Sequence, residues 1–398
     1  MNTKVTRWPY LVAGVLMMLF AGIIYAWSIL KAPLAAEFGW NSAALGLNYT
    51  ITLSTFCLGG VLGGILINKL PPRLVVIIAG ISVFAGFIIT SMLQGNLYLL
   101  YASYGVLAGL GIGVAYNAII STVTSWYPDK RNTASGIMMM GFGASTLVLG
   151  SVAGFLINSI GWRITYLALG ISVLAIFVLG SFFMKKPGAD VKLPMPKVNK
   201  RSNEVTQDYS PMEMLKRASF WKFFIYAIFL IAIGQCVISF AKDVAMSVGA
   251  AESLAILLVG VLSVCNGLSR VITGILYDKI GRKSTMLIAG VLAITAPTLM
   301  LLAVTAHSIP LMVAGLCAIG LAFGTMPPTT SGFMSSFYGQ KYFPLNFGIV
   351  GISTIPASIV ATVAGAMVSA SGNYNSVFIM LIAFGVLDFL LVLSIKKP

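Results

Sequence analysis

Runs of about 20 apolar residues recur roughly every 30 residues along almost the whole chain. A helix needs about 20 such residues to cross the hydrocarbon core of a bilayer. Of the 398 residues, 58% are hydrophobic and 9% are charged, whereas roughly a quarter of the residues of a soluble domain are charged. The pattern therefore predicts an all-α, multi-pass membrane protein. It excludes a soluble enzyme and a secreted disulfide scaffold.

Charges, Pro and Gly mark the ends of twelve expected transmembrane helices. They lie at about 8–30, 45–67, 74–94, 97–124, 133–159, 162–184, 220–241, 253–277, 285–306, 309–337, 345–370 and 375–395. One long connection divides them into two six-helix bundles, 1–184 and 220–398. This linker, 185–219, is rich in Pro and charge, and Ser210 and Glu213 have the spacing of a capping box. We expect a short amphipathic helix there.

The charged residues between the spans indicate how the chain is oriented. Alternate connections, beginning with the N-terminus, hold twenty-one Lys and Arg residues, and the opposite set holds three: Lys31, Arg163 and Lys242. By the positive-inside rule, both termini are cytoplasmic, in a bacterial or archaeal inner membrane. This asymmetry accounts for most of the net charge of +15. We therefore expect no nucleic-acid partner.

The two halves resemble each other in sequence. Residues 64–73 align with 274–283 at an offset of 210, and 109–113 align with 320–324 at an offset of 211. Such repeats are typical of transporters whose halves enclose a cavity near the middle of the membrane and open it to either side in turn. The sequence thus favours a secondary transporter.

No cofactor or metal is expected. The four cysteines, Cys57, Cys236, Cys265 and Cys317, are isolated in apolar runs, which is unlike the spacing of zinc sites or disulfide frameworks. The chain has no GxxxxGK[ST] loop and no HExxH pair, so neither ATP hydrolysis nor zinc hydrolase chemistry is indicated. We expect a protein that is not an enzyme.

Arg270 is the residue that most suggests a substrate. It lies inside the span 253–277, where a cation costs roughly 2.5 to 3.5 kcal/mol, and Asn266 and Tyr277 share its helical face. A guanidinium can hold a carboxylate through two parallel hydrogen bonds. The alternative is an arginine that extends to the cytoplasmic interface.

Further candidates are polar or aromatic residues within apolar spans. The expected substrate contacts besides Arg270 and Asn266 are Tyr25, Tyr116, Asn117, Phe142, Phe323 and Thr354. Phe142 and Phe323 also fit simple packing. Lys242 and Asp243 form either a gate or proton relay, or an interfacial ion pair, at the outer end of their span. Asp388 is an acid among apolar residues of the last span, with a weaker case for function because that span is expected at the periphery.

Two sets of motifs resemble a known family. The sequence Gly-Ile-Leu-Tyr-Asp-Lys-Ile-Gly-Arg-Lys at 274–283 is similar to the loop motif of the major facilitator superfamily. The resemblance implies a conformational latch at Asp278, Lys279 and Arg282. A narrower resemblance, to the oxalate/formate antiporter branch, is carried by the sequences at 266–270, 25–28, 126–131 and 241–243. This resemblance implies that Arg270 holds the substrate carboxylate.

The chain also departs from that branch. The helix 11 position at which oxalate carriers have a basic residue falls at about Thr354, and the helix 4 arginine of many proton-coupled facilitators would fall near Gly105. A small monocarboxylate of the pyruvate, lactate or formate class is therefore the expected substrate, carried by a monomer in the lipid bilayer and coupled to protons, with Asp243 as the titratable group. The alternatives are an oxalate/formate-type anion exchanger, and a carboxylate sensor that does not transport.

Overall fold

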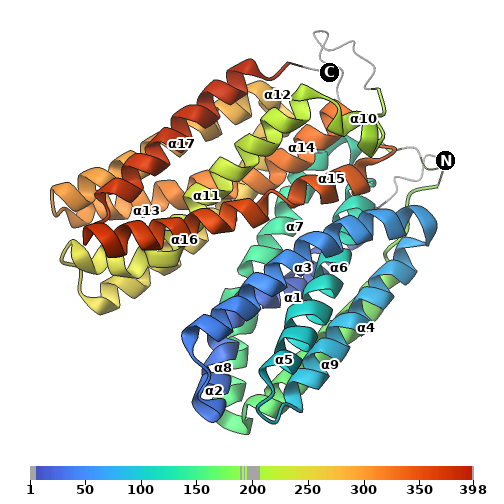
Figure 1. Cartoon of the computed structure of the whole chain (residues 1–398). Helices are drawn as coiled ribbons and strands as arrows, with labels where there is room; N and C mark the ends of the chain where they lie inside the picture. The colour runs from blue at the N-terminus through green and yellow to red at the C-terminus, as the bar shows by residue number, and fades with distance from the viewer. Residues whose placement is uncertain (1–5, 189–190, 192, 195–206, 397–398) are drawn as a thin grey trace. The chain divides into compact units, whose positions relative to one another are not determined.

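The computed structural model describes residues 6–188, 191, 193–194 and 207–396, and in this part of the chain it is almost entirely helical. Eleven of the helical segments in these residues are long and apolar enough to cross a membrane. The chain forms two compact units, Met1–Val205 with Gln340–Ile352, and Thr206–Gly339 with Ser353–Pro398. Figure 1 shows the helices of each unit lying alongside one another.

The first unit contains the helices of the N-terminal half and one short helix from much later in the sequence. They are α1 (Trp8–Ala21), η1 (Gly22–Ala26), α2 (Trp27–Phe38), α3 (Ser42–Lys69), α4 (Pro72–Ser91), α5 (Leu97–Leu100), η2 (Tyr101–Ala108), α6 (Gly109–Thr124), η3 (Pro128–Lys130), α7 (Arg131–Ser145), η4 (Thr146–Gly150), α8 (Ser151–Ile160), α9 (Trp162–Ser181) and α15 (Phe343–Gly351).

The second unit begins at α10, whose N-cap is the capping box of Ser210 and Glu213. Its helices are α10 (Pro211–Leu215), α11 (Ala218–Ser247), α12 (Glu252–Thr305), α13 (Ile309–Gly324), α14 (Met326–Tyr338), α16 (Thr354–Ser371) and α17 (Asn375–Ser394).

The helix α12 covers two of the expected spans. It runs for 54 residues with a single break in helical geometry at Gly281, where φ is 78° and ψ is 178°. Only glycine adopts such a conformation readily, so the sequence fixes the position of this turn. By length and composition, α12 contributes one 53-residue segment, Ser253–Thr305, to the eleven candidate spans of the described chain.

Prolines explain two other interruptions. Pro327 removes the hydrogen bond to the carbonyl of Phe323 and crowds it, and α13 ends at Gly324. Pro356 acts in the same way on Ile352, and α15 ends at Gly351. The break at 351–353 coincides with the boundary between the two units.

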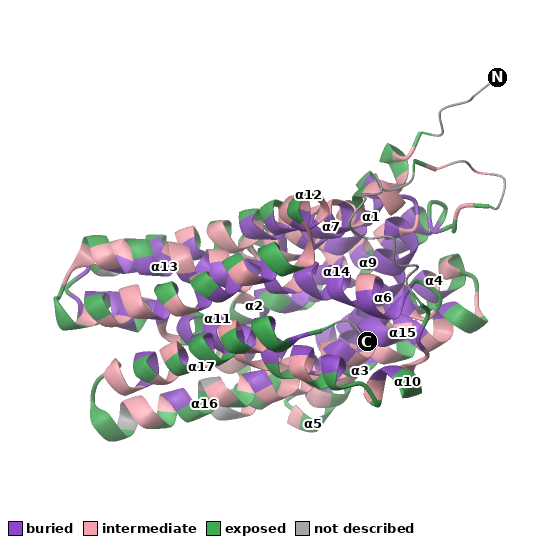
Figure 2. Ribbon diagram, turned by 90° about the horizontal axis from the view of Figure 1, so that it is seen from above, coloured by how far each residue is buried: buried purple, intermediate pink, exposed green. Residues whose placement is uncertain are grey.

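Glycines allow the helices of the first unit to approach closely. The helix α6 is buried along most of its length (Figure 2), and it packs against α3. A Cβ at Gly63 would lie 2.8 Å from the carbonyl oxygen of Val114, closer than any real contact. The backbones of α3 and α6 are therefore in direct contact at this point, and a side chain larger than that of glycine does not fit at Gly63.

Candidate functional site

Arg270 lies in the first part of α12 and is 7% exposed. Its Nε donates a hydrogen bond of 3.3 Å to Oδ1 of Asn266, one helical turn earlier. The guanidinium plane is thereby oriented by a side chain of its own helix. The spacing of four residues predicted that Asn266 and Arg270 share a helical face, and the hydrogen bond between them comes from the structure.

The helix α13 supports the segment that carries Arg270. Ser269 donates a 2.6 Å hydrogen bond from its hydroxyl to the carbonyl of Leu321. A Cβ at Gly324 would overlap the carbonyl of Asn266, so only glycine allows this approach. Phe323, the residue before Gly324, is half-buried and packs against Gly234 of α11. These contacts fix the backbone on which Arg270 stands.

The first unit brings five aromatic rings together from α3, α6, α7, α15 and η1. Ring centroids are separated by 5.2 Å for Tyr25 and Phe142, 5.0 Å for Tyr116 and Phe142, 5.3 Å for Phe56 and Tyr116, and 6.2 Å for Tyr116 and Phe347. We call these five residues the aromatic cluster. Sequence reasoning selected Tyr25, Tyr116 and Phe142 but missed the other two, because an aromatic residue in an apolar span has no distinguishing signal.

Tyr25 presents its ring from an irregular segment. It lies in η1, a turn of 3-10 helix between α1 and α2, and is 37% exposed. A Cβ at Gly22 would overlap the carbonyl of Phe142, so this part of η1 lies directly on α7. A stretch of 3-10 helix within a longer helix is typical of functional positions.

Asn117 has a different environment from the aromatic residues beside it. It is 1% exposed, and its Nδ2 donates hydrogen bonds of 2.6 Å to the carbonyl of Gly60 and 2.7 Å to the carbonyl of Pro344. Both amide hydrogens are thus engaged by the backbones of α3 and α15. The geometry gives Asn117 a role in holding these helices together.

Packing of α15 on α3 is correspondingly tight. A Cβ at Gly64 would lie 2.6 Å from both the carbonyl oxygen of Pro344 and the Cα of Leu345, and one at Gly348 would lie 2.6 Å from the carbonyl oxygen of Gly60. We call this contact, together with Asn117, the α15 clasp. Its helix comes from the second half of the sequence but belongs to the first unit.

The segment with Lys242 and Asp243 follows a distortion of α11. Phe240 has φ of −131° and ψ of 21°, which interrupts the helix, and its ring centroid lies 5.8 Å from that of Tyr374. Lys242 is half-buried and Asp243 is exposed. Burial, and secondarily the charge of Asp243, raise the pKa of Tyr374. Thr354, half-buried, begins α16 directly after the break at 351–353.

The expected latch residues Asp278, Lys279 and Arg282 have different surroundings near the Gly281 turn. The guanidinium of Arg282 lies over the ring of Phe337, 4.6 Å from its centroid. Asp278 is half-buried and interacts electrostatically with Tyr277, whereas Lys279 is exposed. In the first unit, Arg131 lies over the ring of Phe343 in the same manner, at 4.2 Å.

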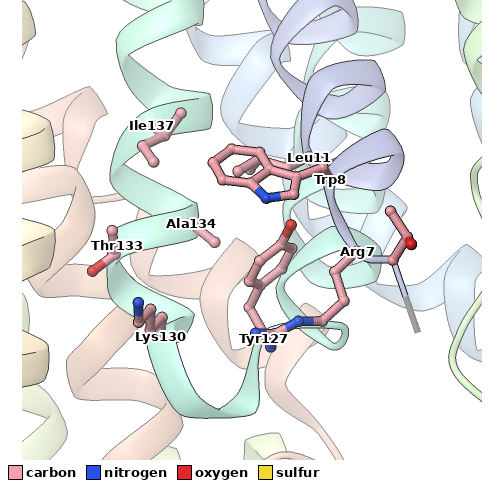
Figure 3. Close-up of a pocket in the computed structure, with 9 residues that line it drawn as sticks. Arg7, Trp8, Leu11, Tyr127, Lys130, Thr133, Ala134 and Ile137 are labelled. Carbon is pink, nitrogen blue, oxygen red and sulfur yellow. The ribbon is translucent and has the colours of Figure 1, made fainter. Parts of the chain in front are cut away.

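A separate pocket of about 470 Å³ opens near the start of α1. In Figure 3, side chains of α1 and α7 face each other across it. The pocket is lined by Thr6, Arg7, Trp8, Leu11, Tyr127, Lys130, Thr133, Ala134 and Ile137. Arg7 forms an ion pair with Asp129, and this hydrogen bond raises the pKa of Arg7. None of the expected substrate contacts lines this pocket.

Comparison with known proteins identifies the family of the chain. The profile of the Major Facilitator Superfamily matches residues 10–242 and 229–398. The chain belongs to the Major Facilitator Superfamily. It is therefore a transporter with many apolar membrane helices, as the loop motif at 274–283 and the recurring apolar runs predicted.

Among characterised relatives, the oxalate:formate antiporter of Oxalobacter formigenes is 26% identical over 379 residues, which cover 94% of this chain and 88% of that protein. Monocarboxylate transporter 12 of Mus musculus is 25% identical over 354 residues, 80% of this chain and 70% of the relative. The crystal structure of the superfamily transporter FucP in its outward conformation has a TM-score of 0.75, at 15% identity, over 98% of this chain and 99% of FucP. The predicted resemblance to the oxalate/formate antiporter branch is confirmed.

Proposed function

We propose that this superfamily member carries a small monocarboxylate of the pyruvate, lactate or formate class across the membrane by alternating access, in symport with protons. The observation that carries the proposal is the buried guanidinium of Arg270, oriented by Asn266. A carboxylate is the small anionic group whose geometry matches the guanidinium fork. The relatives named for oxalate, formate and monocarboxylates support the same chemical class.

Charge counting favours a monocarboxylate over oxalate. Arg270 is the one cation that the sequence places deep within a span, and one guanidinium neutralises one carboxylate. The second carboxylate of oxalate would be desolvated without a matching charge, which is strongly unfavourable. Thr354, where a second cation is expected in oxalate carriers, is uncharged.

Aromatic and amide groups complete the proposed substrate contacts. Tyr25, Tyr116 and Phe142 are in mutual contact in the aromatic cluster, and such rings suit the small apolar part of pyruvate or lactate. Phe323 and Thr354 are the proposed contacts from the second unit. Asn117 is proposed to act through the α15 clasp.

The finer topology belongs to the same proposal. Twelve transmembrane helices arise if α12 crosses the membrane twice, with the turn at Gly281 between the crossings. In the proposed topology the protein lies in the inner membrane. The distribution of Lys and Arg predicts that both termini and the linker 185–219 are cytoplasmic. The two bundles are 1–184 and 220–398, and the transporter acts as a monomer.

Uptake into proteoliposomes tests the function. Purified protein in vesicles without internal substrate should accumulate radiolabelled pyruvate, lactate or formate when the external pH is lower than the internal pH. Excess unlabelled monocarboxylate should compete, and oxalate should compete weakly. Absence of uptake and of exchange for every carboxylate tested would refute the proposal.

Anion exchange is the second candidate, supported by the name of the Oxalobacter relative. An exchanger requires substrate on both sides, so uptake would appear only in vesicles preloaded with a carboxylate. Uptake would then also be independent of the pH gradient. The same vesicles therefore distinguish symport from exchange.

A further inference from the structure

Asp388 is a buried acid that the proposed substrate site does not use. It lies in α17, six residues before the end of that helix at Ser394, which is about 9 Å at 1.5 Å per residue. Its exposure is 0%, and neither carboxylate oxygen has a hydrogen-bond partner in the described part of the chain. An ionised carboxylate in such surroundings is strongly unfavourable. Burial of a neutral carboxyl group costs far less free energy.

Tyr226 lies on α11 at the level of Asp388 on the neighbouring helix α17. Tyr226 is also 0% exposed, and its hydroxyl has no hydrogen-bond partner among the described residues. Two contacts between α11 and α17 lie on either side of this pair. The ring centroids of Phe229 and Phe384 are 4.7 Å apart, and Nζ of Lys222 donates a 3.0 Å hydrogen bond to the carbonyl of Ser394. Two buried polar groups therefore occupy the same level of two packed helices, and a protonated carboxyl can donate to a phenol oxygen.

Other titratable groups around α17 are few. The helices α11, α12 and α16 pack against it. The sequence of α16 contains no titratable residue, and α12 has none beyond Lys283 in the segment that faces Gly385 and Phe389. On α11, Lys222 donates from Nζ to the carbonyl of Ser394, at the very end of α17. The remaining titratable side chains of α11 are Cys236, Lys242 and Asp243, and those of the first part of α12 are Glu252, Cys265, Arg270, Tyr277, Asp278, Lys279 and Arg282.

Another pair of hydroxyl groups lies near the Gly281 turn. The hydroxyl of Tyr277 lies 3.3 Å from Oγ of Ser336. Tyr277 also interacts electrostatically with Arg282 and Asp278, which are both half-buried at the turn. These polar groups belong to the second unit, as do Tyr226 and Asp388.

We propose that Asp388 and Tyr226 form a proton-binding site, in which burial keeps the carboxyl of Asp388 protonated beside the phenol of Tyr226. A proton from hydronium forms the O–H bond of Asp388 when a conformational change opens the site to water. Release breaks that bond and returns the proton to water. The proposal rests on the proposed function, since this proton is the one that moves with the substrate.

Asp388 suits this role better than Asp243, the acid that the sequence indicated. Asp243 is exposed, so it can exchange protons with the surrounding water continuously. A coupling site must instead withhold its proton from water until the protein changes conformation. Full burial of both Asp388 and Tyr226 meets that requirement.

Infrared titration of the purified transporter tests the site without any substrate. The wild type should show a protonated carboxyl band at pH 7 that is absent in Asp388→Asn and shifted in Tyr226→Phe, which removes the neighbouring hydroxyl. Tyr98→Phe is the matched control, because Tyr98 is 81% exposed, and its spectrum should equal that of the wild type. No protonated band assignable to Asp388 at pH 7 would overturn the proposal.

Vesicle assays then connect the site to transport. One proton moved with each substrate yields about tenfold accumulation per pH unit at equilibrium. Asp388→Asn should reduce this to no accumulation while exchange of labelled for unlabelled substrate persists, and Asp388→Glu should restore the drive. Wild-type accumulation in Asp388→Asn would overturn the proposal, as would loss of the drive in Asp243→Asn alone. If the band behaves as expected but no carboxylate is transported, the proposed function fails and the proton site stands.

Discussion

Replacing Arg270 by glutamine removes the cation on which carboxylate recognition is proposed to depend. The guanidinium is 7% exposed, and its Nε is held by Asn266, so its terminal nitrogens are oriented before a substrate arrives. In this desolvated site, loss of one bidentate, charge-assisted contact should cost about 2 to 4 kcal/mol. The affinity for a monocarboxylate should therefore fall about 30-fold to 1,000-fold.

The variants Arg270→Lys and Asn266→Ala separate charge from geometry. Lysine keeps the charge but lacks the planar fork, so Arg270→Lys should still bind poorly. Asn266→Ala leaves the charge in place and removes the charge-assisted hydrogen bond that orients the guanidinium, so the loss of affinity should be smaller than in Arg270→Gln. The combined variant should lose no more than Arg270→Gln, because Asn266 acts through the arginine.

Binding can be measured by calorimetry or thermal shift with pyruvate, lactate and formate on detergent-purified protein. Arg163→Gln is the matched control, since Arg163 pairs with Glu37 at an exposed site where both side chains are more than a third exposed. It should bind like the wild type. Monocarboxylate affinity that is unchanged in a folded Arg270→Gln variant would refute the assignment of the substrate site.

Three further predictions concern specificity, the α15 clasp and the linker. A lysine at Thr354 supplies a second cation, so in competition assays it should shift preference from monocarboxylates toward oxalate; oxalate binding tightest in the unmodified protein would contradict the charge counting. Gly64→Ala should lower the melting temperature by the equivalent of about 1 to 3 kcal/mol, because its Cβ would collide with the backbone of α15, whereas Gly46→Ala, on the same helix with nothing within 4 Å, should not. Hydrogen bonds from Ser210 hold the pKa of Glu213 below its ordinary value of about 4.3, so the capping box stabilises α10 above that pH and loses its effect as the pH falls through the lower, folded-state pKa. In Ser210→Ala, carboxyl NMR titration should show the pKa of Glu213 moving toward its ordinary value, while the backbone N–H of residue 210 and the charges of Arg217 and Lys216 still hold it below that value.

Local rules allowed several features of this chain to be derived directly. The length of the apolar runs predicted a multi-pass helical membrane protein, because the thickness of a bilayer fixes the length of a span. The charged loop motif at 274–283 predicted a connection between two spans, and the structure has its break in α12 within that motif at Gly281, where φ of 78° favours glycine. The capping box at Ser210 and the pairing of Asn266 with Arg270 follow from spacings of three and four residues along one helix. All of these involve residues close together in the sequence.

The aromatic cluster shows where such rules stop. Tyr116 and Phe142 stood out as polar or bulky groups in apolar spans, but Phe56 and Phe347 joined them only through the packing of α3 and α15. Phenylalanine is common in membrane helices for packing alone, and its sequence position does not reveal which neighbours it meets. Asn117 illustrates the converse, since its position suggested a ligand contact and its two hydrogen bonds go to the backbone.

The sequence by itself determined the membrane class, the repeat, the turn at Gly281 and the buried cation at Arg270, because each depends on the composition or spacing of residues within one or two helices. Only the tertiary structure decided that α15 packs with the first unit and that Asp388 lies at the level of Tyr226 on the neighbouring helix. The physical reason is that both are contacts between helices distant in sequence. Their formation depends on where glycine surfaces allow backbones to approach and on which buried faces then coincide, and no spacing along a single helix encodes either.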